Sequence, residues 1–200
     1  DRQLAEVKEQ DGIAVVAHPH WSSLSIEEIK KLGKFDAVEI YNHTVESSIG
    51  KGFATEVWDL LLRDGFRIFG FAVDDAHASY EINKGWVTVN ADDLSYNEIF
   101  NSLKTGNFYS TLSPEFYKIQ LDGTRLFIRT SPVKKIKIIS TGVARGHVIE
   151  AKNRKKLTCA SINLNDKIFW NNDWMYDMYA RVEIQDEKGR KAWLNPIYIE

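Results

Sequence analysis

The chain has 200 residues, ordinary fractions of apolar and charged side chains, and a formal net charge of −2. A charge this close to neutral gives no global electrostatic case for nucleic-acid binding, and no apolar run approaches the roughly 20 residues of a membrane-spanning helix. The single cysteine, Cys159, excludes an internal disulfide framework and fits a reducing compartment. We therefore expect a cytoplasmic protein with neither nucleic-acid nor membrane partners.

The first half of the chain alternates between strand-like and helix-like segments. Residues 13–17, 36–41 and 67–73 are apolar runs of strand length. Between them, Ser25 opens a helix with a capping-box pattern, and residues 53–64 carry apolar positions at helical spacing. This alternation indicates βαβ units and a parallel sheet, so the fold class is α/β. A further strand at residues 85–89 and a helix that begins at Ser95 follow.

Beyond Pro114 the pattern changes to short alternating segments separated by turn signals such as Asp122-Gly123. Segments of this length and spacing predict a small antiparallel β-sandwich. We therefore expect two domains, residues 1–114 and residues 115–200. The predicted strands of the second domain are residues 116–121, 125–130, 135–140, 146–151, 157–162, 178–185 and 191–199.

Polar side chains follow each of the first three predicted strands. Because the carboxyl ends of parallel strands meet at one edge of a sheet or barrel, we expect these side chains to lie close together. A metal site at that edge is the simplest common explanation. The residues are His18, Pro19 and His20 after the first strand, Asn42 and His43 after the second, and Asp74, Asp75 and His77 after the third.

Three of these residues are the predicted metal ligands. Asp75 and His77 are two positions apart, which in an extended chain places both side chains on the same side. Two adjacent carboxylates after an apolar strand are costly unless a cation compensates them. The alternative is that Asp75 is a helix N-cap and His77 a solvent-facing histidine. With His18, whose alternative is a hydrogen-bonded core or capping histidine, the set suits zinc, manganese or iron. Asp74 is expected to orient a ligand.

Other polar residues near the same edge are candidates for substrate contact. His20 is a ligand, a substrate contact or a surface residue beside Trp21. Asn42 and His43 fall where a substrate would lie at the carboxyl end of their strand. Glu39 either belongs to the site or is a strand charge that points to the sheet end or pairs with a lysine.

The second domain carries few chemical signals. His147 fits a surface strand position, and Cys159 sits in a strand without a nucleophile motif. Trp170 and Trp174 lie in an aromatic and polar stretch that is either a sugar-stacking loop or a buried aromatic contact.

Three segments resemble, in this order, motifs of the PHP (polymerase and histidinol phosphatase) superfamily of metallohydrolases: GIAVVAHPHW, FDAVEIYNH and GFAVDDAHA. The segment GWVTVNADDLSYNEIFNSLKTGNFYSTLSPEF is similar to the one that closes the PHP domain. The ending YARVEIQDEKGRKAWLNPIYIE resembles the β-sandwich of a carbaryl-hydrolase-like subgroup. The resemblance covers nearly the whole chain.

The resemblance implies a fold, a cofactor and a partner. The fold would be the carboxyl-terminal half of a distorted (β/α)7 barrel followed by the sandwich. The complete site would hold two or three divalent ions, with His18, Asp75 and His77 in the places of family ligands. The family's opening His-x-His strand and its further ligands do not precede His18 here. Residues 1–114 are thus expected to be a partial PHP domain that associates with the missing amino-terminal half or with a second copy.

The function that the resemblance implies is metal-dependent hydrolysis of a small-molecule phosphoester, with His20, Asn42 and His43 touching the substrate. This chain would supply the carboxyl-terminal part of the active site and would be inactive alone. Carbamates or carboxylic esters are alternative substrates for the carbaryl-hydrolase-like subgroup. A non-catalytic binding or assembly module, with a partial or structural metal site, is the alternative of a different class.

Overall fold

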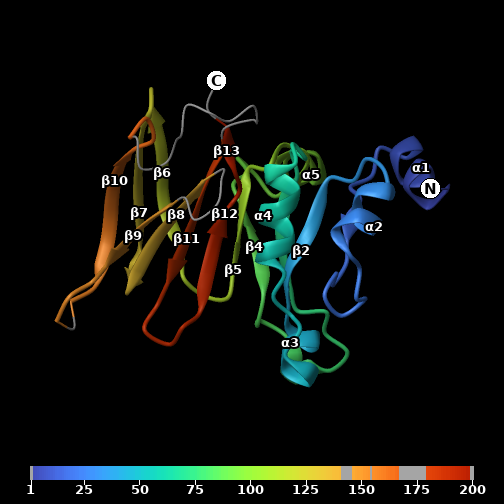
Figure 1. The fold of residues 1–200 in the computed structure, drawn as a ribbon, viewed down its shortest axis with the longest axis horizontal. Helices are drawn as coiled ribbons and strands as arrows, with labels where there is room; N and C mark the ends of the chain where they lie inside the picture. The colour runs from blue at the N-terminus through green and yellow to red at the C-terminus, as the bar shows by residue number, and fades with distance from the viewer. Residues whose placement is uncertain (1, 141–145, 154, 167–178, 199–200) are drawn as a thin grey trace. The chain divides into compact units, whose positions relative to one another are not determined.

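The computed structural model describes residues 2–140, 146–153, 155–166 and 179–198 (Figure 1). The chain mixes helices with parallel and antiparallel strands. It divides into two compact units, a first unit of Asp1–Ser110 and a second unit of Thr111–Glu200. The division falls a few residues before the predicted boundary near residue 114.

The first unit contains a parallel sheet of β1 (Val15–Val16), β2 (Ala37–Asn42) and β3 (Phe69–Val73), in the order β1-β2-β3. The predicted parallel arrangement is therefore confirmed. β2 is buried along nearly its whole length because its apolar side chains pack on both faces of the sheet. β1 differs from the predicted buried strand, since it is only two residues long and Val15 is 37% exposed.

Helices cover this sheet, and their limits follow from local signals. α2 (Ile26–Lys31) begins with the predicted capping box between Ser25 and Glu28. α4 (Thr55–Arg63) packs against β2, and α2 packs against α4 (Figure 1). Trp58 is fully buried and donates its indole N–H to the Ile68 carbonyl at 3.2 Å. A further helix, α1, spans Arg2–Glu9. Within the described ranges, no helix combines the length and apolar character needed to cross a bilayer.

A short helix that the sequence pattern did not predict, α3 (His43–Ile49), follows β2 directly. Asn42 caps it, because its side-chain oxygen accepts the N–H of Val45 at 3.0 Å. Gly50 ends it with a φ of 69°, the left-handed conformation that glycine adopts at little cost. The chain therefore turns from strand to helix at the point where the site residues lie.

The rest of the first unit comprises η1 (Ser79–Glu81), β4 (Trp86–Val89), α5 (Tyr96–Thr105) and β5 (Phe108–Thr111). Ser95 caps α5 as predicted, accepting the N–H of Glu98 at 3.3 Å. Ser110 ties β5 to β3, since its hydroxyl accepts the N–H of Ala72 at 2.8 Å and donates to the Gly70 carbonyl at 2.7 Å. This buried bridge helps to fix the strand that leads into Asp74 and Asp75.

The second unit consists of antiparallel strands, as predicted. β6 (Phe116–Asp122), β7 (Arg125–Val133) and β10 (Leu157–Asn163) form one group in the order β10-β7-β6. A second group contains β8 (Lys135–Ser140), β9 (Gly146–Glu150), β11 (Tyr179–Gln185), β12 (Lys191–Leu194) and β13 (Ile197–Tyr198). Alternate apolar side chains of both groups are fully buried, among them Leu126, Ile128, Ile136, Ile138 and Val182.

Candidate functional site

The carboxyl ends of β1, β2 and β3 bring polar groups together at one edge of the parallel sheet. The side-chain amide of Asn42 donates to Glu39 Oε2 and to Asp75 Oδ2, both at 3.1 Å. The main-chain N–H of His18 donates to the same Glu39 oxygen at 2.7 Å. Groups from all three strand ends therefore share one hydrogen-bonded cluster, as the parallel topology predicts.

Asn42 organises this cluster. Its side chain is 1% exposed, and its oxygen is committed to capping α3. The amide nitrogen must then face the two carboxylates, which fixes the orientation of the side chain. The predicted contact between Asn42 and a substrate stays a prediction, since all the contacts that the structure gives this side chain are internal.

Glu39 and Asp75 both contact the Asn42 amide and are called here the edge carboxylate pair. Within the described ranges, neither side chain makes a salt bridge to a lysine, an arginine or a histidine. Of the alternatives for Glu39, a lysine pair is not found among the described residues, and both a site role and a charge that points to the sheet end stay open. Two carboxylates on one neutral amide repel each other, so a cation placed between or beside them would be favourable.

His18 leaves the strand with a positive φ of 29°, which a side-chain-bearing residue adopts only when its surroundings hold it there. Its ring nitrogen Nδ1 lies 2.9 Å from the Ser22 hydroxyl. Trp21 packs edge-on against the imidazole, with 4.9 Å between the ring centroids. The imidazole is half-buried. These contacts leave Nε2 as the ring atom that is available to a ligand.

The segment after β3 departs from the predicted extended geometry. Asp75 has a φ of 51°, so the argument that an extended chain places Asp75 and His77 on the same side does not apply. Both residues are exposed. Thr44, from α3, donates its hydroxyl to the Asp75 carbonyl at 2.8 Å and fixes the turn. The turn aims Asp75 at Asn42, which the sequence alone did not indicate.

Asp74 anchors the far end of the same loop. Its carboxylate accepts three consecutive main-chain N–H groups, from Asn83 at 2.8 Å, Lys84 at 2.6 Å and Gly85 at 2.7 Å. A carboxylate satisfied by three amides is typical of an anion-binding turn. Asp74 therefore orients the loop that carries Asp75 and His77, and its predicted action on a metal ligand stays a prediction.

Glu81 is a residue of this region that the sequence reading missed. Its carboxylate is buried and accepts the N–H groups of His77 at 2.7 Å and Ala78 at 2.8 Å. The His77 amide above all, with the Ala78 amide and the Thr44 hydroxyl, holds the pKa of Glu81 below its usual range against the opposing effect of burial. The Ala78-to-Glu81 spacing is that of a helical first turn, a signal that could have found this contact.

His43 and His20 lie near the same strand ends. His43 opens α3, and its Nδ1 lies 3.1 Å from the hydroxyl of Tyr41. Burial, with the charges of Glu46 and Asp74, raises the pKa of Tyr41 to about 12, so its hydroxyl keeps its proton at neutral pH. His20 is half-buried in the turn after His18. Their roles in contacting a substrate stay predictions.

The side chains at this edge are of types that bind divalent cations, but too few of them lie together to hold one. Among the residues that the structure describes, no group of three or more His, Cys, Asp or Glu side chains is arranged to hold a metal ion. His18, Asp75 and His77 therefore do not form a ligand set by themselves in this structure. Carboxylates and imidazoles are nevertheless the ligands that zinc, manganese and iron use, so the edge fits part of such a site.

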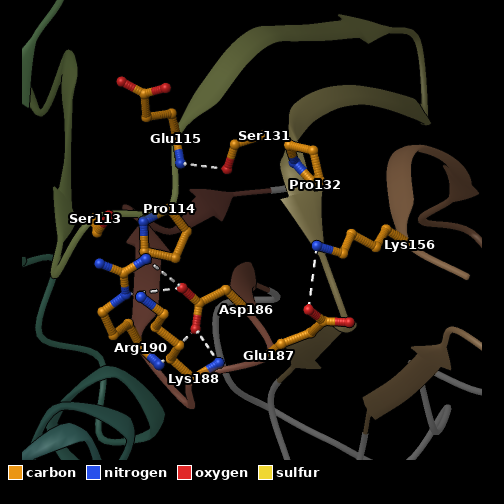
Figure 2. A pocket seen from close by; sticks show the side chains of 10 residues that line it. All are labelled: Ser113, Pro114, Glu115, Ser131, Pro132, Lys156, Asp186, Glu187, Lys188 and Arg190. Atoms are coloured by element: carbon orange, nitrogen blue, oxygen red, sulfur yellow. Dashed lines mark hydrogen bonds and ion pairs between the residues drawn. The ribbon is translucent and has the colours of Figure 1, made fainter. Parts of the chain in front are cut away.

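The second unit contains a polar pocket of about 370 Å³. Figure 2 shows two ion pairs in its lining, Arg190 with Asp186 at 2.7 Å and Lys156 with Glu187 at 3.1 Å. Glu115 and Lys188 also line the pocket, so its six charged side chains sum to zero net charge. His147 and Cys159 are exposed on β9 and β10, as the surface interpretation of His147 predicts. Trp170 and Trp174, the candidates for sugar stacking, lie outside the described residues.

Comparison with protein-family models, with curated proteins and with solved structures finds no match to this chain.

Proposed function

We propose that this chain supplies the carboxyl-terminal part of the active site of a PHP-type, metal-dependent phosphoester hydrolase. The observation that carries the proposal is the edge carboxylate pair, in which Glu39 and Asp75 share the amide of Asn42 without a cation from the described chain. In this proposal the parallel sheet and its helices are part of a distorted (β/α)7 barrel. The antiparallel strands of the second unit are the appended β-sandwich.

Electrostatics favours a ligand with positive charge at this edge. Neutral hydrogen bonds only partly offset the repulsion between two carboxylates, and a divalent cation removes it. His18, Asp75 and His77 are the residues that would hold zinc, manganese or iron. When bound, such a cation lowers the pKa of a coordinated water and stabilises negative charge on a phosphoester oxygen.

The remaining residues of the edge would orient these ligands and the substrate. Asn42 aligns the two carboxylates, and Thr44 holds the turn at Asp75. His20 and His43 would contact the substrate with Asn42 at the rim. The Tyr41 hydroxyl steadies Nδ1 of His43, which leaves Nε2 to exchange a proton at the substrate.

The proposed site needs ligands in addition to those that the described residues bring together. β1 lies at one edge of the parallel sheet, and Val15 is 37% exposed there. An exposed parallel edge is a surface on which another strand can pair. The further ligands would come from a polypeptide that pairs with β1, either the amino-terminal half of the same protein or a second copy of this chain.

The test is hydrolysis by the natural, purified protein, characterised by intact mass and metal content. We expect bound zinc, manganese or iron and cleavage of p-nitrophenyl phosphate or bis(p-nitrophenyl) phosphate, with loss of activity in Asp75→Asn and His77→Ala. Asp122→Asn, an exposed carboxylate of β6, is the matched control and should remain active. Cleavage of p-nitrophenyl acetate or an aryl carbamate alone would favour the ester or carbamate alternative. Full activity in both site variants would refute the proposed site.

A non-catalytic assembly module is the second candidate, because the described residues do not assemble a metal ligand set by themselves. In that case any metal would be structural and fully enclosed by protein ligands, whereas a catalytic metal keeps an open position. X-ray absorption spectroscopy of the metal-loaded protein, with and without inorganic phosphate, separates the two. A change in coordination with phosphate supports catalysis, and an unchanged closed shell supports assembly.

A further inference from the structure

The segment Asp74–Gly85, called here the site loop, is held at three points by side chains that bond to its main chain. Asp74 binds the N–H groups at its far end, and Thr44 binds the carbonyls of Asp74 at 3.2 Å and Asp75 at 2.8 Å. Glu81 provides the third point, through the N–H groups of His77 and Ala78. The loop is therefore bonded on either side of the pair Asp75 and His77.

We propose that Glu81 is a positioning residue that fixes the main chain of His77 and so sets where its imidazole stands relative to Asp75. The proposal rests on the proposed function of the edge as a metal-dependent site. A single oxygen, Oε2, accepts both N–H groups, at 2.7 and 2.8 Å. Because both donors belong to consecutive residues, this oxygen restrains the peptide on each side of the His77 side chain.

The burial of Glu81 supports the proposal that this residue positions the main chain of His77. The residue is 7% exposed, although glutamate is rarely buried unless its charge is well paired. Hydrogen bonds from N–H groups to a carboxylate are shorter and stronger than those to a neutral acceptor. The Glu81 carboxylate therefore holds the loop firmly. His77 itself is exposed and has little packing of its own to hold it.

A pair of conservative variants separates positioning by contact from a general effect of charge. Glu81→Gln keeps the reach of the side chain and a carbonyl oxygen that can accept both N–H groups, but it removes the charge. Glu81→Asp keeps the charge and shortens the reach by one methylene. If contact matters, E81Q keeps most of the behaviour of the unaltered protein and E81D does not. Asp93→Ala is the matched control, since Asp93 also accepts a loop N–H, that of Ser95 at 2.7 Å.

The first readout is made on the full, metal-free chain by NMR. We expect E81D to lower the backbone order parameters of residues 75–78 and to average the χ1 couplings of His77, and E81Q to preserve both. D93A should leave these residues unchanged. Unchanged order at residues 75–78 in E81D, or equal disorder in E81Q and E81D, would overturn the proposal. Glu81→Ala, if it folds, should match E81D.

The second readout is Zn²⁺ affinity, measured by calorimetry on the same proteins. Partners that orient a metal ligand typically contribute roughly 10- to 100-fold to metal affinity, so we expect a loss of about 10-fold in E81D and a smaller loss in E81Q. Equal affinity in all three proteins would overturn the proposal even if the loop loosens. If the unaltered protein binds no Zn²⁺, the proposed function fails, and the NMR result alone then decides whether Glu81 positions His77.

Discussion

Each unit places carboxylate charge among other polar groups, but the two units compensate that charge differently. In the second unit, Glu183 of β11 has a side chain only 4% exposed. It accepts bonds from Lys137 Nζ at 2.8 Å and from the indole N–H of Trp193 at 3.0 Å, with Lys191 Nζ at 3.4 Å. Burial would raise the pKa of Glu183, but Lys137, Lys191 and Arg181 hold it below its usual range. This cluster is complete without a ligand.

In the first unit, the edge carboxylate pair shares a neutral amide and receives no cation from the described chain. Two lysines neutralise the charge of Glu183. The charges of Glu39 and Asp75 could instead be neutralised by a bound cation. We therefore interpret the group around Glu183 as structural and the edge carboxylate pair as a candidate functional site. Three predictions test this distinction and a fourth tests the environment of Tyr41 beside the same strand end; the largest expected effect comes first.

Removing Glu183 should strongly destabilise the second unit. Glu183→Ala leaves two lysines and a buried indole N–H without their shared acceptor, and we expect a loss of about 3 kcal/mol in the free energy of unfolding. The contribution is present above the unfolded pKa of about 4.5 and fades as the pH falls through the lower folded pKa. Chemical denaturation at pH 7 and pH 4 measures both effects. Glu150→Ala, which removes an exposed strand ion pair with Lys135, is the control, with an expected loss below about 1 kcal/mol. Equal losses in the two variants would contradict this account.

Adding a third carboxylate at the edge should make the charge imbalance visible. Asn42→Asp keeps a good N-cap for α3 but places negative charge between Glu39 and Asp75, and we expect a loss of about 2 kcal/mol in stability. Mn²⁺ or a lower pH should restore part of this loss, as followed by thermal unfolding. Ser95→Asp also introduces an aspartate at a helix N-cap, that of α5, away from other paired carboxylates, and should be nearly neutral. A neutral N42D variant would mean that the edge already has an unseen cation or is well solvated.

Stability should fall between pH 10 and pH 12 because of Tyr41. The folded protein keeps this phenol protonated up to a pKa of about 12, whereas the unfolded chain loses the proton near pH 10. Since the folded state then binds the proton more tightly, stability decreases as the pH rises through this interval, by about 2 kcal/mol. Denaturation of the unaltered protein and of Tyr41→Phe over this pH range isolates the effect. Identical pH slopes for the two proteins would show that Tyr41 is not perturbed.

The smallest effect on stability should come from Asp75, the residue with the largest expected role in metal binding. It is exposed, and removing its charge relieves repulsion with Glu39, so Asp75→Asn should change stability by no more than about 0.5 kcal/mol. Asp74→Asn, at the neighbouring position, weakens three bonds to main-chain N–H groups and should cost about 1 kcal/mol or more. Calorimetric unfolding measures both variants. A large loss in D75N with none in D74N would reverse the roles assigned to these residues.

The sequence predicts the parallel sheet and the meeting of strand ends because apolar runs and helix caps are local signals. It does not predict the contacts that build the edge. The pattern gives Asn42 as a rim residue, whereas the structure uses it to cap α3 and hold two carboxylates. The positive φ of Asp75 and the hydrogen bond from Thr44 to the Asp75 carbonyl depend on tertiary packing. The spacing of residues along the sequence does not predict either of them. Glu81 was missed because a buried carboxylate that binds main-chain N–H groups resembles a surface glutamate in sequence.

The most direct test of the central claim is an NMR titration of the full chain with Mn²⁺, which broadens the signals of nuclei close to the bound ion. The account predicts that the amides of residues 18, 39, 42, 75 and 77 broaden first, and that D75N abolishes this while D122N does not. Broadening that begins at Asp186 and Glu187 in the second unit, or no selective broadening, would contradict the assignment of the edge carboxylate pair as a cation site.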